Sequence, residues 1–101
     1  MIEKKAILLT YPDESSIQEA VALVESAGLT NTIVVPRRRL GEGKYGIGSG
    51  AASKLADTIS TEGCEIVILD SRLKSVQAYN LAKLLGVRVL DREELILEIF
   101  S

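Results

Sequence analysis

Short apolar runs alternate with longer segments of helical periodicity along the whole chain. The runs have the length and composition of buried strands, and they are Ala6–Thr10, Thr32–Val35, Glu65–Asp70 and Val87–Leu90. After each run, apolar residues recur every three or four positions, which predicts a helix. The predicted helices are one between Asp13 and Gly28, then Ala51–Thr61, then Val76–Leu85, and a last one that Asp91 caps.

Four strand and helix pairs in sequence, βαβαβαβα, predict an α/β fold. Uninterrupted apolar strands favour a parallel sheet with helices on both faces, and right-handed crossovers favour the strand order 2-1-3-4. In that order the chain reverses direction between the first and third strands, and ligands of such sheets bind near this reversal, beyond the carboxyl ends of the strands. The segments expected there are Tyr11–Glu14, the loop after Pro36, and Asp70–Ser75.

Length and composition restrict the chemistry. A chain of 101 residues is one domain by size and can form a core without a metal or disulfide. It has no histidine and one cysteine, Cys64, which excludes Cys-His and Ser-His nucleophilic sites, zinc sites and a disulfide framework, and predicts no metal site. The first apolar run is too short for a signal peptide or a membrane span, so we expect a cytoplasmic protein.

Positive charge and glycine gather in one segment, Pro36–Leu55. It contains five basic residues and one acidic residue, a net charge of +4, whereas the whole chain carries −2 and the remainder therefore −6. A mobile basic loop on an acidic body is typical of a surface that meets an anion, most plausibly a phosphate.

Two nucleotide-binding motifs can be tested against this segment. Gly41–Gly46 matches G-x-G-x-x-G, but that fingerprint belongs directly after a first strand, whereas this copy lies several residues beyond the second. A Walker A sequence is absent, because no G-x-x-x-x-G is followed by lysine and serine or threonine. The sequence therefore predicts no GTPase or ATPase site in this chain and no catalytic residue.

Two interpretations of the segment remain open. The backbone N–H groups around the helix start, with a nearby lysine, predict a weak phosphate or nucleotide site at Gly46, Gly48, Ser49, Gly50 and Lys54. Alternatively, the glycines only permit a tight crossover and the arginines form a solvated face. The arginine triplet favours RNA, with Arg37, Arg38, Arg39 and Lys44 as the contacts. Tyr45 is the one aromatic residue of the loop, so base-specific readout is not expected.

Two further features concern Asp70, Asp91 and the end of the chain. Both aspartates close strands and could act as an acid and base pair, but we favour structural roles, a turn for Asp70 and a helix cap for Asp91.

The residues Leu95–Phe100 are apolar nearly all round a helix. We therefore expect an excised domain whose last helix docks through Leu97 and Phe100, with possible self-association of the isolated chain.

Several of these segments together carry a family resemblance. They are Arg37–Arg39, the run Tyr45–Gly50 leading to Leu55, the run Ile68–Asp70 with Leu73, Gln77, Asn80 and Leu81, and the closing stretch Val89–Phe100. The chain resembles the amino-terminal domain of HflX-type GTPases over essentially its whole length, and the closing stretch, DR followed by LILEIF, is its most specific part.

The resemblance implies a cytoplasmic, translation-associated GTPase that binds the large ribosomal subunit. In such a GTPase, this domain precedes a helical hairpin and a Ras-like G domain. The G domain would hold GTP and magnesium, and this chain would hold no cofactor. The basic loop becomes a candidate contact for ribosomal RNA or for the G domain. A purely structural docking domain, or a stand-alone nucleotide-binding module, is the alternative. The family often carries lysines where this chain has Ser49 and Ala51, which weakens a nucleotide-phosphate role of the loop.

Overall fold

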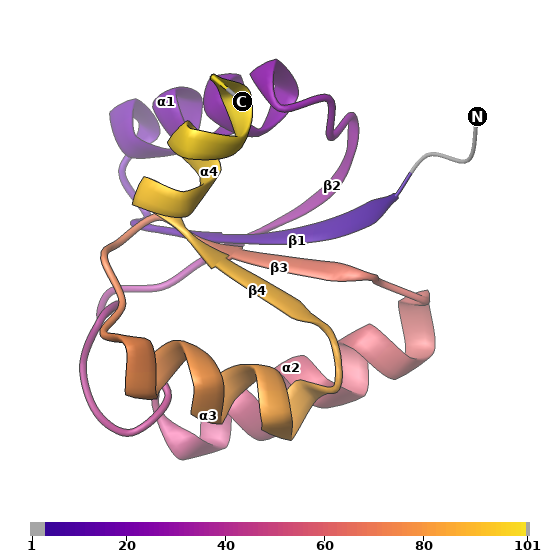
Figure 1. The fold of residues 1–101 in the computed structure, drawn as a ribbon, viewed down its shortest axis with the longest axis vertical. Helices are drawn as coiled ribbons and strands as arrows, with labels where there is room; N and C mark the ends of the chain where they lie inside the picture. The colour runs from indigo at the N-terminus through magenta and orange to yellow at the C-terminus, as the bar shows by residue number, and fades with distance from the viewer. Residues whose placement is uncertain (1–3, 101) are drawn as a thin grey trace.

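The computed structural model describes residues 4–100 and contains one four-stranded sheet with four helices. All strands are parallel and their order is β2-β1-β3-β4, as the sequence predicts. Two helices, α1 and α4, cover one face of the sheet, and α2 and α3 cover the other (Figure 1). The α/β fold and its strand order are thereby confirmed.

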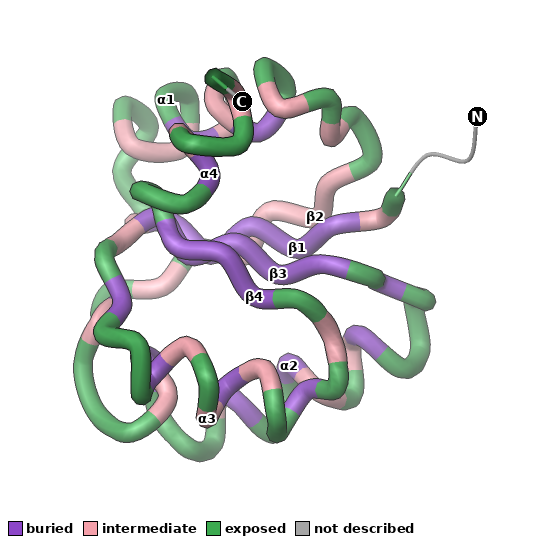
Figure 2. Tube along the Cα trace, in the orientation of Figure 1, coloured by how far each residue is buried: buried purple, intermediate pink, exposed green. Residues whose placement is uncertain are grey.

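The strands are short, and the central two are the most buried. Strand β1 is Lys5–Thr10 and β3 is Ile66–Leu69, and these pair with each other through the register Ala6↔Ile66 to Leu9↔Leu69. The outer strands are β2, Asn31–Pro36, and β4, Arg88–Asp91. Because helices cover both faces, β1 and β3 are buried along most of their length, which explains their uninterrupted apolar sequence (Figure 2).

The helices begin and end close to the predicted positions. They are α1 Glu14–Ser26, α2 Ser49–Glu62, α3 Ser75–Leu85 and α4 Arg92–Ile99. The side chain of Asp13 caps α1 by accepting a hydrogen bond from the Ser16 N–H, and this bond holds the pKa of Asp13 below its ordinary value. Helix α2 begins two residues before the predicted Ala51, because Gly48 takes the extended cap conformation and Gly50 lies inside the helix.

Each face of the sheet has its own apolar core. Between the sheet and α2 and α3 lie Ile7, Leu9, Leu55, Val67, Leu81 and their neighbours, and between the sheet and α1 and α4 lie Leu8, Val24, Ile68, Leu90 and Leu95. Cys64 belongs to the first core, where burial raises the pKa of its thiol, in keeping with a structural role. Among the helices of residues 4–100, none is long and apolar enough to cross a bilayer.

Candidate functional site

The basic, glycine-rich loop begins at the carboxyl edge of the sheet and runs from Arg37 to Gly48, the cap of α2. The Arg37 N–H donates to the Thr10 carbonyl at 2.7 Å, which extends the pairing of β2 with β1 by one residue. Further on, Leu40 and Ile47 are buried in the core beneath α2 and α3. The Gly41 N–H donates to the Gly46 carbonyl at 2.8 Å and closes the loop between these two anchors. The loop is thus a closed turn with both ends fixed.

A buried glutamine of α3 holds the middle of the loop. The Gln77 side-chain amide donates to the carbonyls of Gly41 at 3.0 Å and Gly43 at 2.8 Å, and its oxygen accepts from the Lys74 N–H at 2.9 Å. One turn later, the Asn80 amide donates to the Lys44 carbonyl at 3.2 Å. The loop is therefore anchored to α3 by side chains, in contrast to the mobile segment that its glycines predict.

Gly46 allows the loop to approach the β3 end of the sheet closely. Its φ is +73°, and a Cβ at this position would lie 2.3 Å from Leu73 Cδ2 and 3.4 Å from Leu69 Cδ2. Any side chain here would have to displace a buried leucine as well as adopt a left-handed backbone. Glycine is thus required at this position by both conformation and packing.

The anchored loop presents its cations to solvent. Arg38, Arg39 and Lys44 are exposed and Arg37 is half-buried. The ion pairs found within residues 4–100 use other cations: Lys5 with Glu62, Arg72 with Glu93, Arg88 with Glu98, and Arg92 with Asp70. In that part of the chain, the three loop arginines therefore have no carboxylate partner.

The predicted phosphate site is divided by the fold. Gly48, Ser49 and Gly50 lie together at the exposed amino terminus of α2, which has no side-chain cap. Lys54 follows in the second turn and is exposed. Gly46 is separate from them, because it is buried against Leu73. The phosphate site at these residues stays a prediction.

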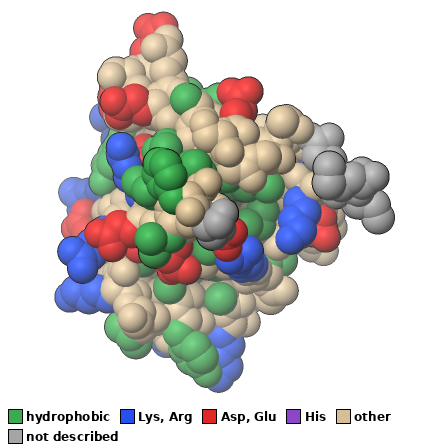
Figure 3. Space-filling view, turned by 45° about the horizontal axis from the view of Figure 1, so that its top comes forward, with side chains coloured by type: hydrophobic (Ala, Val, Ile, Leu, Met, Phe, Trp, Pro, Cys, Tyr) green, Lys and Arg blue, Asp and Glu red, His purple; other side chains and the backbone are tan. Residues whose placement is uncertain are grey.

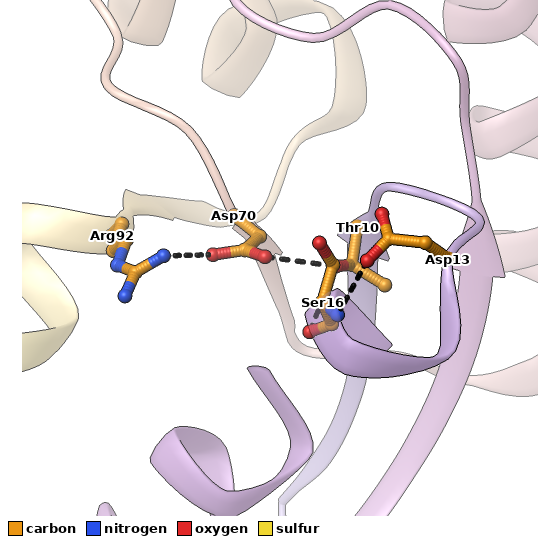
Figure 4. A network of polar contacts seen from close by, with 5 residues as sticks. All are labelled: Thr10, Asp13, Ser16, Asp70 and Arg92. Atoms are coloured by element: carbon orange, nitrogen blue, oxygen red, sulfur yellow. Dashed lines mark hydrogen bonds and ion pairs between the residues drawn. The ribbon is translucent and has the colours of Figure 1, made fainter. Parts of the chain in front are cut away.

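A polar network fills the carboxyl edge where the chain reverses direction between β1 and β3 (Figure 4). The Thr10 hydroxyl donates to Asp70 Oδ2 at 2.8 Å, and the other oxygen of Asp70 contacts Arg92 at 3.3 Å. Thr10 and Asp70 are buried. The Asp70 carboxylate thus links β1, β3 and α4, a stronger structural role than the turn predicted for it.

The second aspartate of this edge, Asp91, caps α4. It accepts hydrogen bonds from the Glu94 N–H and from the Leu73 N–H, each at 2.9 Å. Both of its oxygens are therefore engaged with backbone donors, which confirms the predicted helix cap. The arrangement indicates no acid and base pair at Asp70 and Asp91, because each carboxylate already holds structural partners.

The last helix buries only part of its apolar surface. Leu95 is 2% exposed and packs on the sheet, whereas Leu97 and Phe100 are 70% and 83% exposed. These two side chains have no covering element in residues 4–100, as the sequence predicts for a helix that is apolar nearly all round. Their role in docking stays a prediction.

Sequence reasoning missed two parts of this surface. Gln77 and Asn80 contribute to the loop from α3, about 35 residues along the chain, and the available signal was a polar residue, Gln77, among the apolar positions of the buried face. The solvent face of α3 also carries an exposed aromatic residue, Tyr79, whereas Tyr45 of the loop is half-buried. Only the folded chain brings these residues together.

Charge differs between the two sides of the domain. Residues 71–90 contain four basic and no acidic side chains, whereas α1 contains three acidic and no basic ones. In the view of Figure 3, acidic side chains lie at the top and basic ones along the left side and at the lower end, with both kinds near the centre. The loop that carries the cations is held to α3 by Gln77 and Asn80, and α3 adds the exposed Lys83.

Comparison with known proteins decides the family. Residues 14–101 match the model of a family described as GTP-binding GTPase N-terminal. The chain belongs to this family of GTPase amino-terminal domains. It is 42% identical to the GTPase HflX of Methanocaldococcus jannaschii over 89 residues and 36% identical to that of Escherichia coli over 90 residues. These alignments cover 87% and 88% of the chain, which spans about a fifth of each relative, 22% and 21%.

Solved structures give the same result for this GTPase amino-terminal domain. A GTP-binding protein from Sulfolobus solfataricus, in complex with GDP, matches with a TM-score of 0.70 and 29% identity. The match covers 96% of the domain and 30% of that protein. A variant described as SsGBP G235P matches with a TM-score of 0.72 and 28% identity over 96% of the domain. The resemblance to HflX-type amino-terminal domains is thereby confirmed.

Proposed function

We propose that this domain contacts RNA of the large ribosomal subunit on behalf of an HflX-type GTPase. In this proposal GTP and magnesium bind in a G domain elsewhere in a longer cytoplasmic protein, which a helical hairpin joins to this domain. The domain itself hydrolyses nothing, and its role in translation is to position the GTPase on the subunit. Its RNA contacts are Arg37, Arg38, Arg39 and Lys44.

The observation that supports the proposal is the presentation of these cations. The loop that carries them is fixed by Leu40, Ile47 and Gln77, and the arginines have no carboxylate partner within residues 4–100. An anchored backbone reduces the ordering cost of binding, and unpaired cations can neutralise phosphates without first losing an intramolecular partner. The net charge of the chain is −2, so attraction to RNA has to come from a local patch.

Co-sedimentation of the longer protein with large ribosomal subunits tests the proposal. The paired variant Arg38→Ala/Arg39→Ala removes two exposed cations. The logarithm of RNA affinity falls with the logarithm of salt concentration by about 0.7 for each phosphate contact, so the loss of two contacts predicts a roughly 25-fold loss of affinity at about 0.1 M salt. Lys4→Ala/Lys5→Ala is the control, since it removes two positive charges at the opposite edge of the sheet, one of them paired with Glu62, and it should change affinity by less than about twofold. Equal losses in both variants would show a general charge effect and contradict the assignment of the loop.

Docking within the longer protein is a second candidate, which the exposure of Leu97 and Phe100 favours. An uncovered leucine and phenylalanine on one short helix form an apolar surface suited to another part of the same protein. We expect the isolated chain to self-associate through these residues, and Leu97→Ser/Phe100→Ser to make it monomeric in sedimentation velocity. A wild-type chain that stays monomeric at millimolar concentration would count against this role.

The third possibility, nucleotide phosphate binding at Gly46, Gly48, Ser49, Gly50 and Lys54, has less support. Three of these residues form a helix amino terminus, which attracts anions but is common to all helices. No further side chain converges on that terminus in the contacts described above. We therefore favour RNA contact.

A further inference from the structure

The solvent face of α3 carries an exposed aromatic residue next to a lysine. Val76, Tyr79 and Lys83 recur at helical spacing, and Val76 and Tyr79 are 61% and 64% exposed. The Lys83 ammonium lies 5.9 Å from the centre of the Tyr79 ring. The opposite side of the helix, with Leu81 and Leu85, is buried in the core. Tyr79 therefore contributes little to the core and presents its ring to solvent.

The basic loop reaches the same face of α3. Asn80, the neighbour of Tyr79, donates its side-chain amide to the Lys44 carbonyl at 3.2 Å. Lys44 in turn lies 5.6 Å from the centre of the Tyr45 ring. The fold thus brings the Lys44 backbone against α3 beside Tyr79, through Asn80, while Tyr45 is half-buried and packs against the core. The sequence alone offered only Tyr45 as an aromatic platform in the loop.

Charge identifies the kind of partner that this surface fits. Residues 71–90 carry no acidic side chain, and Lys74 and Lys83 have no carboxylate partner within residues 4–100. At the lower end of the molecule in Figure 3, hydrophobic and basic side chains adjoin. An exposed ring among unpaired lysines is complementary to a polyanion with exposed planar groups, which is single-stranded nucleic acid. A protein partner would gain only the apolar part of this surface.

We propose that Tyr79 is a stacking platform for an unpaired RNA base, with Lys44 and Lys83 contacting the flanking phosphates. This rests on the proposed function and specifies its substrate, since it requires single-stranded or looped RNA. A base inside a duplex already stacks on both faces and cannot reach a tyrosine on a helix surface. The contact tolerates any base, because every base has a planar face.

Fluorescence anisotropy with this chain and a labelled single-stranded RNA of about 12 nucleotides tests the inference. Tyr79→Ala should weaken binding between about fivefold and 150-fold, the range for loss of one base stack. The slope of affinity against salt should stay unchanged, because the ring neutralises no phosphate. Tyr79→Phe keeps the ring and should bind within about twofold of the wild type. Lys83→Ala should instead reduce the salt slope by about 0.7.

Two controls make the result specific. Tyr79→Leu preserves an apolar side chain without a planar ring and should bind as weakly as the alanine variant. A duplex RNA of the same length should be bound equally by the wild type and Tyr79→Ala. The substitutions lie on an exposed helix face, so thermal unfolding should change little.

The outcomes separate the two proposals. If Tyr79→Ala or Tyr79→Leu binds as well as the wild type while loss of the loop cations abolishes binding, stacking is wrong and RNA contact by the loop stands. In that case the apolar residues of α3 serve a protein partner. If the wild type shows no salt-dependent RNA binding, the proposed function itself is wrong.

Discussion

Replacing Gly46 by alanine is expected to lower the free energy of unfolding by about 2–4 kcal/mol. The φ of +73° costs an alanine about 1 kcal/mol or more, because its Cβ meets the following carbonyl. The new Cβ would also lie 2.3 Å from Leu73 Cδ2, and insertion of a methyl group into a packed site costs about 1–3 kcal/mol. Urea unfolding, followed by circular dichroism, measures the change.

Gly43 provides the matched control for this prediction. Its φ is +76°, nearly the same as that of Gly46, but no atom lies within 4 Å of a Cβ built there. Gly43→Ala should therefore cost only the conformational part, about 1 kcal/mol. Equal destabilisation by the two variants would show that the contact with Leu73 carries no cost, and that the loop is not packed as described.

The second large effect is expected on RNA affinity. Replacing Arg37, Arg38, Arg39 and Lys44 together by alanine should reduce the affinity of the chain for single-stranded RNA about 600-fold at about 0.1 M salt. This figure takes a slope of about −0.7, in the logarithm of affinity against the logarithm of salt concentration, for each of four phosphate contacts. Filter binding or anisotropy measures this loss. The fold should remain, because three of the side chains are exposed and Arg37 is half-buried without an ion pair in the described part of the chain.

The control for this variant with four substitutions has to remove the same number of positive charges elsewhere on the domain. Lys4→Ala/Lys5→Ala combined with Arg88→Ala and Arg92→Ala does so, although three of these substitutions break ion pairs, those of Lys5 with Glu62, Arg88 with Glu98 and Arg92 with Asp70. Its RNA affinity should fall by less than about tenfold, because only the overall electrostatic field of the domain changes. A loss as large as that of the loop variant would contradict a localised contact.

Much of the fold follows from local sequence signals. The apolar strands and the caps at Asp13 and Asp91 are encoded within a few residues, and alternation of strand and helix restricts the topology strongly. The start of α2 was predicted two residues late, because a glycine-rich run carries no propensity signal for a helix start. Gly50 is the second residue of this helix and is exposed.

The candidate surface was less predictable than the fold. The arginine triplet could be seen in the sequence, but the anchoring of its loop depends on Gln77 and Leu73, which meet Gly43 and Gly46 only after α3 packs on the sheet. The contact of Asn80 with the Lys44 carbonyl depends on the same packing. Contacts between residues more than 30 positions apart leave no pattern in one sequence, so the extension of the surface onto α3 could not be predicted.

The hydrogen bond between Thr10 and Asp70 also could not be predicted from local sequence signals. Each residue ends a strand and each could be assigned a local turn, yet they bond to each other across 60 residues, with Arg92 on the other carboxylate oxygen. The parallel register that sets Leu9 opposite Leu69 places them side by side. Residues that follow paired strand ends are therefore worth testing as partners before they are assigned separate roles.

The dependence of RNA affinity on salt tests most directly whether the loop cations neutralise phosphates. If all four do so, they should contribute about −2.8 to the slope of the logarithm of RNA affinity against the logarithm of salt concentration, and Lys83 about −0.7 more. Fourfold more salt should then weaken the binding of the wild-type chain to single-stranded RNA by about fifty-fold or more. The variant without Arg37, Arg38, Arg39 and Lys44 should lose about 2.8 from this slope and keep only the contribution of about −0.7 from Lys83. A wild-type slope near zero, or the same slope in both proteins, would contradict the account.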